Sequence, residues 1–347
     1  MRIGQTLTLL LISLLPGLAP RSATAALAGQ PTLTIAAYDS FLAKGGLGPA
    51  IFPLFESQCH CRLRTISVGS AGQLVGRLEL AAKRGKPLSQ VAIGLDAQSF
   101  YRAVAKKFVE PWGTWQPGDF SKLSGDTRIG NDFLPIDYGI LAFIADKKQT
   151  KERKLQLPRH LSDLADPKWK RNFILEDPRT SAPGLDFMLF AQTQNQEDAI
   201  RGQWLTLTPG WDSAYGLFLK GEAPMVWSYV TSQAYQEMHG DSEGRYTAVV
   251  FDEGMPFQVE GAVLVRDSFR SPEERKLACD FLEFLISPQV QQLIPEKNWM
   301  FPAREGIPLP AAFARLPRPR RLLRLPDDPA KVDSSLKSWE RAAGQKK

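Results

Sequence analysis

Apolar runs alternate with amphipathic segments along the first third of the chain. Three segments rich in apolar residues predict strands, over residues 33–37, 61–67 and 90–95. Three others carry apolar residues at helical spacing and predict helices, over residues 50–57, 73–83 and 97–106. Strands that alternate with helices in this way indicate α/β layers around a largely parallel sheet.

The pattern changes beyond residue 110. A loop-like stretch precedes a long strand-like segment at 133–144, and a second α/β series then begins. Its segments are residues 162–164, 172–175, 185–192, 214–220 and 224–229. A strand-like pair follows at 246–251 and 261–265. Residues 271–274, Ser-Pro-Glu-Glu, then give the clearest helix start, because they combine an N-cap, a proline at the first position and a capping box.

The two α/β series predict two lobes. A chain of 347 residues is longer than one compact core usually needs, and the long strands can carry it from one lobe into the other. The predicted lobes are residues 26–136 with 257–300, and residues 137–256 with 301–347. A hinged chain of this kind suits ligand binding in a cleft between the lobes.

The first 25 residues have the features of a signal peptide. Arg2 supplies a positive start, and residues 7–18 are apolar but too few to span a bilayer. Residues 23–25, Ala-Thr-Ala, fit the small-residue cleavage rule, so we expect an exported chain that starts at Ala26. An uncleaved N-terminal anchor is the alternative interpretation.

Basic residues exceed acidic ones by 43 to 37, and much of the excess lies in residues 315–324. Such a run can contact nucleic acid or acidic lipid. Aromatic residues do not interleave with these arginines, which favours a solvated segment packed across the surface. We therefore expect no nucleic-acid partner.

Motifs for catalysis are absent from the sequence. The three histidines have no metal-site spacing, and the chain contains neither a phosphate-binding P-loop nor a nucleophile elbow at residues 69–72. Cys59 and Cys61 can form a strained small-ring disulfide, or a weak metal site with the intervening histidine. Cys279 lies within a predicted helix and is interpreted as a small buried residue. We expect no enzyme activity, no metal and no cofactor.

Small and aromatic residues mark candidate ligand positions. Residues 69–72 form either a plain turn or a site where backbone N–H groups meet an anion. Tyr38 stands beside Asp39 at a strand end, and an aromatic face near a carboxylate suits a flat cationic heterocycle. Other aromatic residues near loops and strand ends, which core packing can also explain, are Trp211, Tyr215, Trp227, Tyr229, Tyr235 and Trp299.

Short motifs run in a fixed order through almost the whole chain after residue 25. They are YDSF at 38–41, GP at 48–49, CHC at 59–61, GLD at 94–96, DYG at 137–139, DPRTS at 177–181, PGL at 183–185, GW at 210–211, AYGLFLKGE at 214–222, SY at 228–229, TS at 231–232 and NWM at 298–300. Together these motifs resemble the periplasmic thiamine-binding proteins of thiamine ABC importers.

The resemblance implies a two-lobe type II periplasmic binding protein fold with thiamine, or a thiamine phosphate, in a hinged cleft. It implies a monomeric periplasmic protein that delivers this ligand to the permease subunits of an ABC transporter and needs no cofactor. The ligand positions that it implies are Tyr38, Ser70, Ala71, Ser181, Ala182, Trp211, Tyr229, Val230, Thr231, Ser232 and Trp299.

The sequence departs from the family pattern at several of these positions. Glycine stands at 45–46, where the family can place a tryptophan, and no acidic residue occurs around Ser70. Ala182 and Val230 replace hydroxyl-bearing residues. These changes weaken the case for a cation held in the same way as in the family, and they leave a thiamine relative, a phosphate ester or a related pyrimidine as alternative ligands. A thiaminase-like enzyme with a cysteine nucleophile, and a binder of ferric ion or another solute, are the remaining alternatives.

Overall fold

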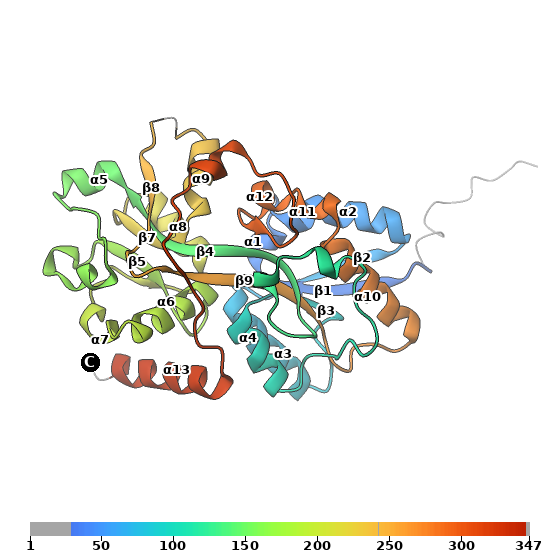
Figure 1. The fold of residues 1–347 in the computed structure, drawn as a ribbon. Coiled ribbons are helices and arrows are strands. Elements are labelled where there is room, and N and C mark those ends of the chain that lie inside the picture. The colour runs from blue at the N-terminus through green and yellow to red at the C-terminus, as the bar shows by residue number, and fades with distance from the viewer. Residues whose placement is uncertain (1–28, 242, 345–347) are drawn as a thin grey trace, which may run out of the picture.

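The computed structural model describes residues 29–241 and 243–344 (Figure 1). The predicted signal peptide, residues 1–25, lies outside the described residues. Within them, the strands form a mixed sheet in the order β2-β1-β3-β9-β4-β7-β5-β6, with β8 and β10 paired to β4 and β11 paired to β9. The strands are β1 (Thr32–Ala37), β2 (Arg62–Ser67), β3 (Val91–Leu95), β4 (Leu134–Asp146), β5 (Phe173–Glu176), β6 (Leu207–Thr208), β7 (Met225–Tyr229), β8 (Tyr246–Val249), β9 (Met255–Leu264), β10 (Phe301–Pro302) and β11 (Leu322–Leu323).

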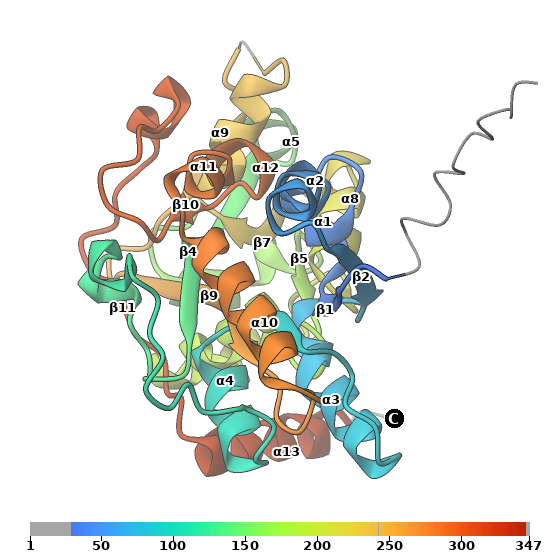
Figure 2. The same ribbon diagram turned by 90° about the vertical axis from the view of Figure 1, so that its right-hand side faces the viewer.

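Helices cover the sheet in each half of the molecule. They are α1 (Asp39–Leu42), α2 (Leu47–Cys59), α3 (Leu74–Lys83), α4 (Ala97–Ala105), α5 (Lys147–Glu152), α6 (Ala182–Thr193), α7 (Glu197–Ile200), α8 (Trp211–Leu219), α9 (Thr231–Met238), α10 (Pro272–Leu285), α11 (Pro288–Gln291), α12 (Ile294–Lys297) and α13 (Pro329–Gly344). Helix α10 packs against β1, β9 and α2, and helices α3 and α4 lie on the opposite side of the strands from α2 (Figure 2). No helix among the described residues has the length and apolar character that crossing a membrane requires.

Two long antiparallel strands connect the halves. Residues 134–140 of β4 pair with β9, whereas residues 141–145 pair with β7. Strand β9 continues past β4 to pair with β3. The first half therefore holds the parallel strands β2, β1 and β3, and the second half holds β7, β5 and β6 (Figure 1). This arrangement confirms the predicted α/β fold class, while the exact lobe boundaries stay a prediction.

The buried core explains why most of the predicted elements formed. Strand β3 is buried along its whole length, as its apolar run predicts. In the second half, Phe143 on β4 packs edge-on against Phe187 and Trp227, with ring centroids 5.9 and 5.1 Å apart. Such aromatic pairs add about 0.5–1.5 kcal/mol each beyond the burial of their area. Ser271 caps α10 as predicted, because its Oγ accepts a hydrogen bond from the backbone N–H of Glu274 at 3.3 Å.

Several elements differ from the sequence prediction, and three of them bear on the pocket or on the C-terminal segment. Strand β9 begins at Met255 rather than at residue 261. Its first half was not predicted, because the polar residues Gln258 and Glu260 interrupt the apolar pattern there. The residues after Tyr229 do not continue as an open strand end, because helix α9 starts at Thr231. Helix α13 has no counterpart in the prediction.

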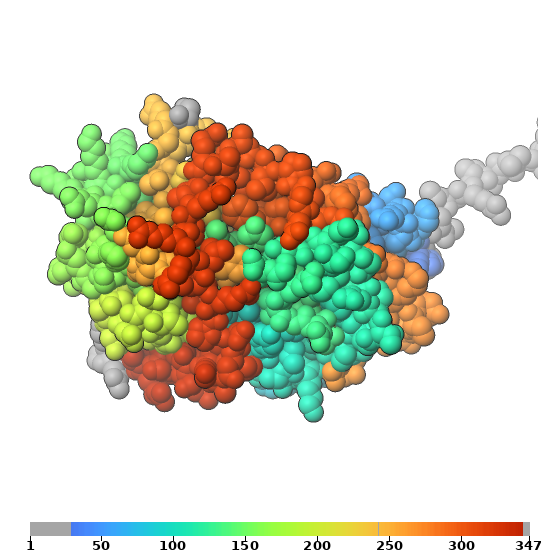
Figure 3. All heavy atoms as spheres, viewed as in Figure 1, coloured from blue at the N-terminus to red at the C-terminus, as the bar shows by residue number. Residues whose placement is uncertain are grey.

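The C-terminal segment contacts both halves of the molecule. Figure 3 shows the stretch that leads to α13, in dark red, crossing one face. Three of its arginines contact the rest of the protein. Arg315 pairs with Glu237, the Arg321 Nη2 donates to the Glu253 carbonyl oxygen at 2.9 Å, and the Arg324 Nη2 donates to the Asp126 carbonyl oxygen at 2.6 Å. Helix α13 then packs against α4, where Asp333 pairs with Arg102 at 3.0 Å, and against α6 through Val332 and Trp339. The basic run is thus bound across the surface, as its composition predicts.

Candidate ligand-binding pocket

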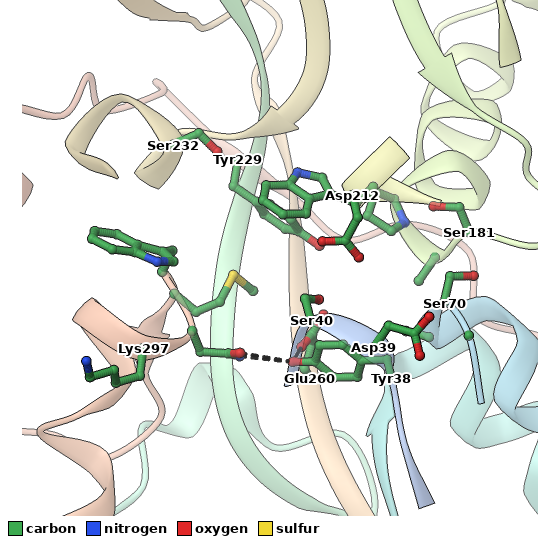
Figure 4. Close-up of a pocket in the computed structure, with 18 residues that line it drawn as sticks. Tyr38, Asp39, Ser40, Ser70, Ser181, Asp212, Tyr229, Ser232, Glu260 and Lys297 are labelled. Atoms are coloured by element: carbon green, nitrogen blue, oxygen red, sulfur yellow. Dashed lines mark hydrogen bonds between the residues drawn. The ribbon is translucent and has the colours of Figure 1, made fainter. Parts of the chain in front are cut away.

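A pocket lies between the two halves, beside the crossing strands β4 and β9 (Figure 4). Its empty space is about 740 Å³, counting the part that is open to solvent. The lining residues come from both halves: Tyr38, Asp39, Ser40, Gly69, Ser70, Ala71, Ser181, Ala182, Pro183, Trp211, Asp212, Tyr229, Ser232, Glu260, Lys297, Asn298, Trp299 and Met300. A ligand held there contacts both halves at once.

Strand ends position the walls of the pocket. Tyr38 directly follows β1, and Tyr229 ends β7. Ser181 lies a few residues after β5 and caps α6, where its Oγ accepts a hydrogen bond from the Gly184 N–H at 3.3 Å. The carboxyl ends of parallel strands therefore face the pocket, which is the usual place for ligands in open α/β sheets.

The halves touch at one edge of the pocket. The Ser70 Oγ of the first half donates to the Thr180 carbonyl oxygen of the second half. Close approach requires glycine here, since a Cβ on Gly72 would come within 2.6 Å of the same carbonyl oxygen. A Cβ on Gly210 would likewise come within 2.9 Å of the Ser70 side chain.

Contacts on both sides fix the aromatic walls. Trp211 stacks on Tyr215, with ring centroids 4.9 Å apart, and its Nε1 donates to the Ser228 Oγ at 2.7 Å. Trp299 packs edge-on against Tyr235 at 4.7 Å. Trp299 also has a positive φ of 56°, a conformation that non-glycine residues rarely adopt and that is concentrated at functional sites.

Tyr38, Glu260 and Asn298 line the floor of the pocket, and their hydrogen-bonded network includes Asp137, which is buried outside the lining. Asp137 and Glu260 face each other across the β4–β9 ladder. The Tyr38 hydroxyl donates to the Glu260 Oε2 at 2.8 Å, and the Asn298 Nδ2 donates to the Asp137 Oδ2 at 2.7 Å. The same Asn298 nitrogen lies 3.0 Å from the Tyr38 hydroxyl. Since β4 and β9 cross between the halves, both halves share this floor.

Burial changes the acidity of the floor. It raises the pKa of Glu260 to about 7, although the hydrogen bond from Tyr38 partly opposes this rise. Burial, followed by the charge of Glu260, raises the pKa of Asp137 well above its ordinary value. A carboxyl group that titrates near neutral pH can either accept hydrogen bonds from an amine or donate one to a ring nitrogen.

A second series of buried hydrogen bonds supports Tyr229. Its hydroxyl donates to the Gln258 Oε1 at 2.6 Å, and the Gln258 Nε2 donates to the Asp186 Oδ2 at 2.7 Å. Gly139 leaves room for the ring, because a Cβ at this position would lie 2.5 Å from Tyr229. Tyr229 is thus held rigidly at the side of the pocket.

Most of the residues predicted from the sequence come together here. Those that line the pocket are Tyr38, Ser70, Ala71, Ser181, Ala182, Trp211, Tyr229, Ser232 and Trp299. Val230 and Thr231 do not line it, because the turn into α9 buries both side chains to 1% exposure or less. Their assignment as ligand positions, like that of the nine lining residues, stays a prediction.

The sequence prediction missed six polar residues of the pocket as ligand positions: Asp39, Ser40, Asp212, Glu260, Lys297 and Asn298. Asp39 and Asp212 each follow a predicted aromatic residue, and that adjacency was the available signal. Asn298 precedes the predicted Trp299 in the NWM motif, which was a signal of the same kind. Glu260 gave no signal, because only the β4–β9 register brings it to the floor. Although no acidic residue stands beside Ser70, the pocket still contains carboxylates from other segments.

The cysteines lie outside the pocket lining. Cys59 and Cys61 form a disulfide at the end of α2. Cys279 is buried in α10, and this burial raises the pKa of its thiol to about 11. Throughout residues 29–241 and 243–344, no cluster of three or more His, Cys, Asp or Glu side chains is arranged to hold a metal ion.

Comparison with known proteins places these features in context. Residues 87–331 match the family model described as bacterial extracellular solute-binding protein. The chain is 36% identical to the thiamine-binding periplasmic protein of Brucella abortus, over 98% of this chain and 97% of that protein. It is also 36% identical to the protein of that name from Escherichia coli, over 91% of this chain and 93% of the relative. A solved structure of a periplasmic thiamin binding protein superposes with a TM-score of 0.79 at 34% identity, covering 94% of this chain and 99% of that one.

Proposed function

The chain belongs to the family of bacterial extracellular solute-binding proteins, and we propose that it captures thiamine in the periplasm and delivers it to the permease of an ABC importer. The observation that carries this proposal is the 36% identity to thiamine-binding relatives over nearly the full length of the chain. The pocket supports it independently, because aromatic side chains and carboxylates line one space between the two halves.

Each part of the pocket suits a part of this ligand. Thiamine joins an aminopyrimidine to a positively charged thiazolium ring. The faces of Tyr38, Trp211 and Trp299 suit stacking on these rings, at about 0.5–2 kcal/mol per contact. The carboxyl group of Glu260 suits the amino edge of the pyrimidine.

The hydroxyethyl end, or a phosphate ester on it, suits the opposite wall. Ser70 and Ser181 offer hydroxyl groups on that side, whereas Ser232 lies across the pocket from them (Figure 4). The N-terminus of α6 adds backbone N–H groups, which favour an anion. The proposal therefore includes thiamine monophosphate and thiamine diphosphate as ligands of the protein.

The proposal includes no catalysis. The chain is similar to solute-binding proteins, and a thiaminase-like reaction needs a reactive cysteine in the cleft. Cys279 is buried with a raised pKa, and Cys59 and Cys61 are joined to each other. Incubation with thiamine and an amine nucleophile, followed by mass spectrometry, tests this part, and base exchange would overturn it.

The test of the proposed function is calorimetric titration of the mature protein with thiamine, thiamine monophosphate and thiamine diphosphate. We expect at least one of them to bind more tightly than about 10 µM, which corresponds to roughly −7 kcal/mol. Tryptophan fluorescence gives a second readout through Trp211 and Trp299. Weaker binding by all three ligands would show that the proposed ligand is wrong.

A further inference from the structure

Two carboxylates meet across the open side of the pocket. Asp39 begins α1 in the first half, and Asp212 lies in the first turn of α8 in the second half. Both line the pocket, and Figure 4 shows their carboxylate groups pointing into the same space from opposite sides. We call these two residues the mouth pair.

The mouth pair lacks positive partners. Among the described residues, neither carboxylate forms a salt bridge, and Lys297 is the one cationic side chain that lines the pocket. The Ser67 hydroxyl donates to Asp39 and holds it in place. Desolvation by the cleft walls and then the negative charge of Asp39 raise the pKa of Asp212. The two carboxylates therefore repel each other across the cleft.

Repulsion between two halves that close on a ligand has a cost. When the cleft closes around an uncharged molecule, the two negative charges approach each other in a medium of lower dielectric constant than water. A positive ring between them reverses the sign of the interaction. Charge complementarity of this kind contributes more to specificity than to total affinity.

We propose that Asp212, acting with Asp39, makes closure of the pocket depend on a positive charge in the ligand, so that the pocket rejects uncharged isosteres of the same shape. This inference rests on the proposed function, since it names the property by which the pocket selects thiamine. Glu260 contacts the aminopyrimidine, which an uncharged isostere shares. The aromatic walls keep their stacking on such an isostere and lose only the cation–π part of it.

The experiment compares thiamine with 3-deazathiamine, an isostere in which an uncharged thiophene replaces the thiazolium ring. We expect the wild-type protein to prefer thiamine by at least about tenfold. In Asp212→Asn, thiamine should bind about fivefold more weakly and deazathiamine slightly more tightly, so that the preference falls to about twofold. Asp39→Asn should act in the same direction, and 0.5 M salt should reduce the wild-type preference.

Asp198→Asn is the matched control, because Asp198 is a fully exposed residue on α7 outside the pocket. It should leave both affinities unchanged. If Asp212→Asn weakens both ligands by the same factor, the inference is overturned while the proposed function stands. If the wild-type protein binds neither thiamine nor its phosphates, both are overturned.

A second measurement does not depend on any ligand. The pKa of Asp212 can be followed by ¹³C NMR of labelled aspartate in the full mature protein. It should fall in Asp39→Asn, because the nearby negative charge is removed. An unchanged pKa would show that the two carboxylates do not act on each other.

Discussion

The mouth and the floor of the pocket each carry a pair of carboxylates, but the two pairs are held in opposite ways. Asp39 and Asp212 at the mouth are open to the solvent in the cleft and come from different halves. Asp137 and Glu260 at the floor are buried, hydrogen-bonded and located on the two strands that both halves share. The mouth can therefore respond to a ligand and to closure, whereas the floor is a fixed part of the fold.

The largest expected effect concerns the floor and pH. Because burial raises the pKa of Glu260 from 4.5 to about 7, the folded protein binds this proton more tightly than the unfolded chain does. The free energy of unfolding should therefore fall between pH 4.5 and pH 7, by about 3 kcal/mol from this group alone. Urea denaturation across this range should show a shallower decrease in Glu260→Gln.

The exposed Glu222 provides the matched control for this pH dependence. Glu222→Gln should retain the full wild-type decrease in stability. If Glu260→Gln also retains it, the floor does not hold a neutral carboxyl group, and the contrast with the mouth disappears.

Removing the amide that joins the floor should give the next largest effect. Asn298→Leu leaves the Asp137 Oδ2 without its donor at 2.7 Å and removes a partner of Tyr38. An unsatisfied buried polar group costs about 1–3 kcal/mol, so urea denaturation at pH 7 should show a loss of about 2 kcal/mol. Asn131→Leu, at an exposed site, should change the stability by less than about 0.5 kcal/mol.

A wall residue should affect binding rather than folding. Trp211→Ala removes one aromatic face of the pocket and should weaken thiamine binding roughly tenfold in calorimetry. Trp115→Ala, outside the pocket, should leave the affinity within about twofold. Equal affinities of Trp211→Ala and the wild type would remove Trp211 from the site.

The smallest expected effect lies at the edge where the halves touch. Ser70→Ala removes the hydrogen bond to the Thr180 carbonyl oxygen, which forms only when the two halves are close. Closure should then be slightly less favourable, and thiamine should bind about fivefold more weakly, since a typical hydrogen bond contributes about 1 kcal/mol. Ser213→Ala, on an exposed position of α8, should have no such effect. A larger loss of binding in Ser70→Ala would show that this hydroxyl also contacts the ligand, as the proposed function allows, and no loss would show that it does neither.

The walls of the pocket were predictable from the sequence, and the floor was not. Tyr38, Ser181 and Trp211 lie in local motifs between a strand and the following helix. The residues that begin the helix are recognisable in the sequence and reveal this position. Asp137 and Glu260 meet only through the β4–β9 register, between residues more than 120 positions apart. No local pattern encodes such a pairing.

Burial also gave two predicted ligand positions surroundings that the local pattern did not indicate, although their assignment stays a prediction. Val230 and Thr231 follow Tyr229 in what the sequence presents as a polar strand end, but α9 begins there and turns both side chains into the core. Helix α13 was missed for a related reason. Its apolar residues, among them Val332 and Trp339, are sparse, and they are buried only because α4 and α6 pack against the helix.

Helix α13 has a practical consequence for building an optical sensor. It is anchored on α4 in the first half and on α6 in the second, and Trp339 stacks on Trp204 with ring centroids 5.4 Å apart. A fluorescent domain fused downstream of α13 is therefore coupled to both halves. A dye near β1, by contrast, moves with the first half alone. Energy transfer between the two positions would report how far α13 moves relative to the first half, without altering any residue that lines the pocket.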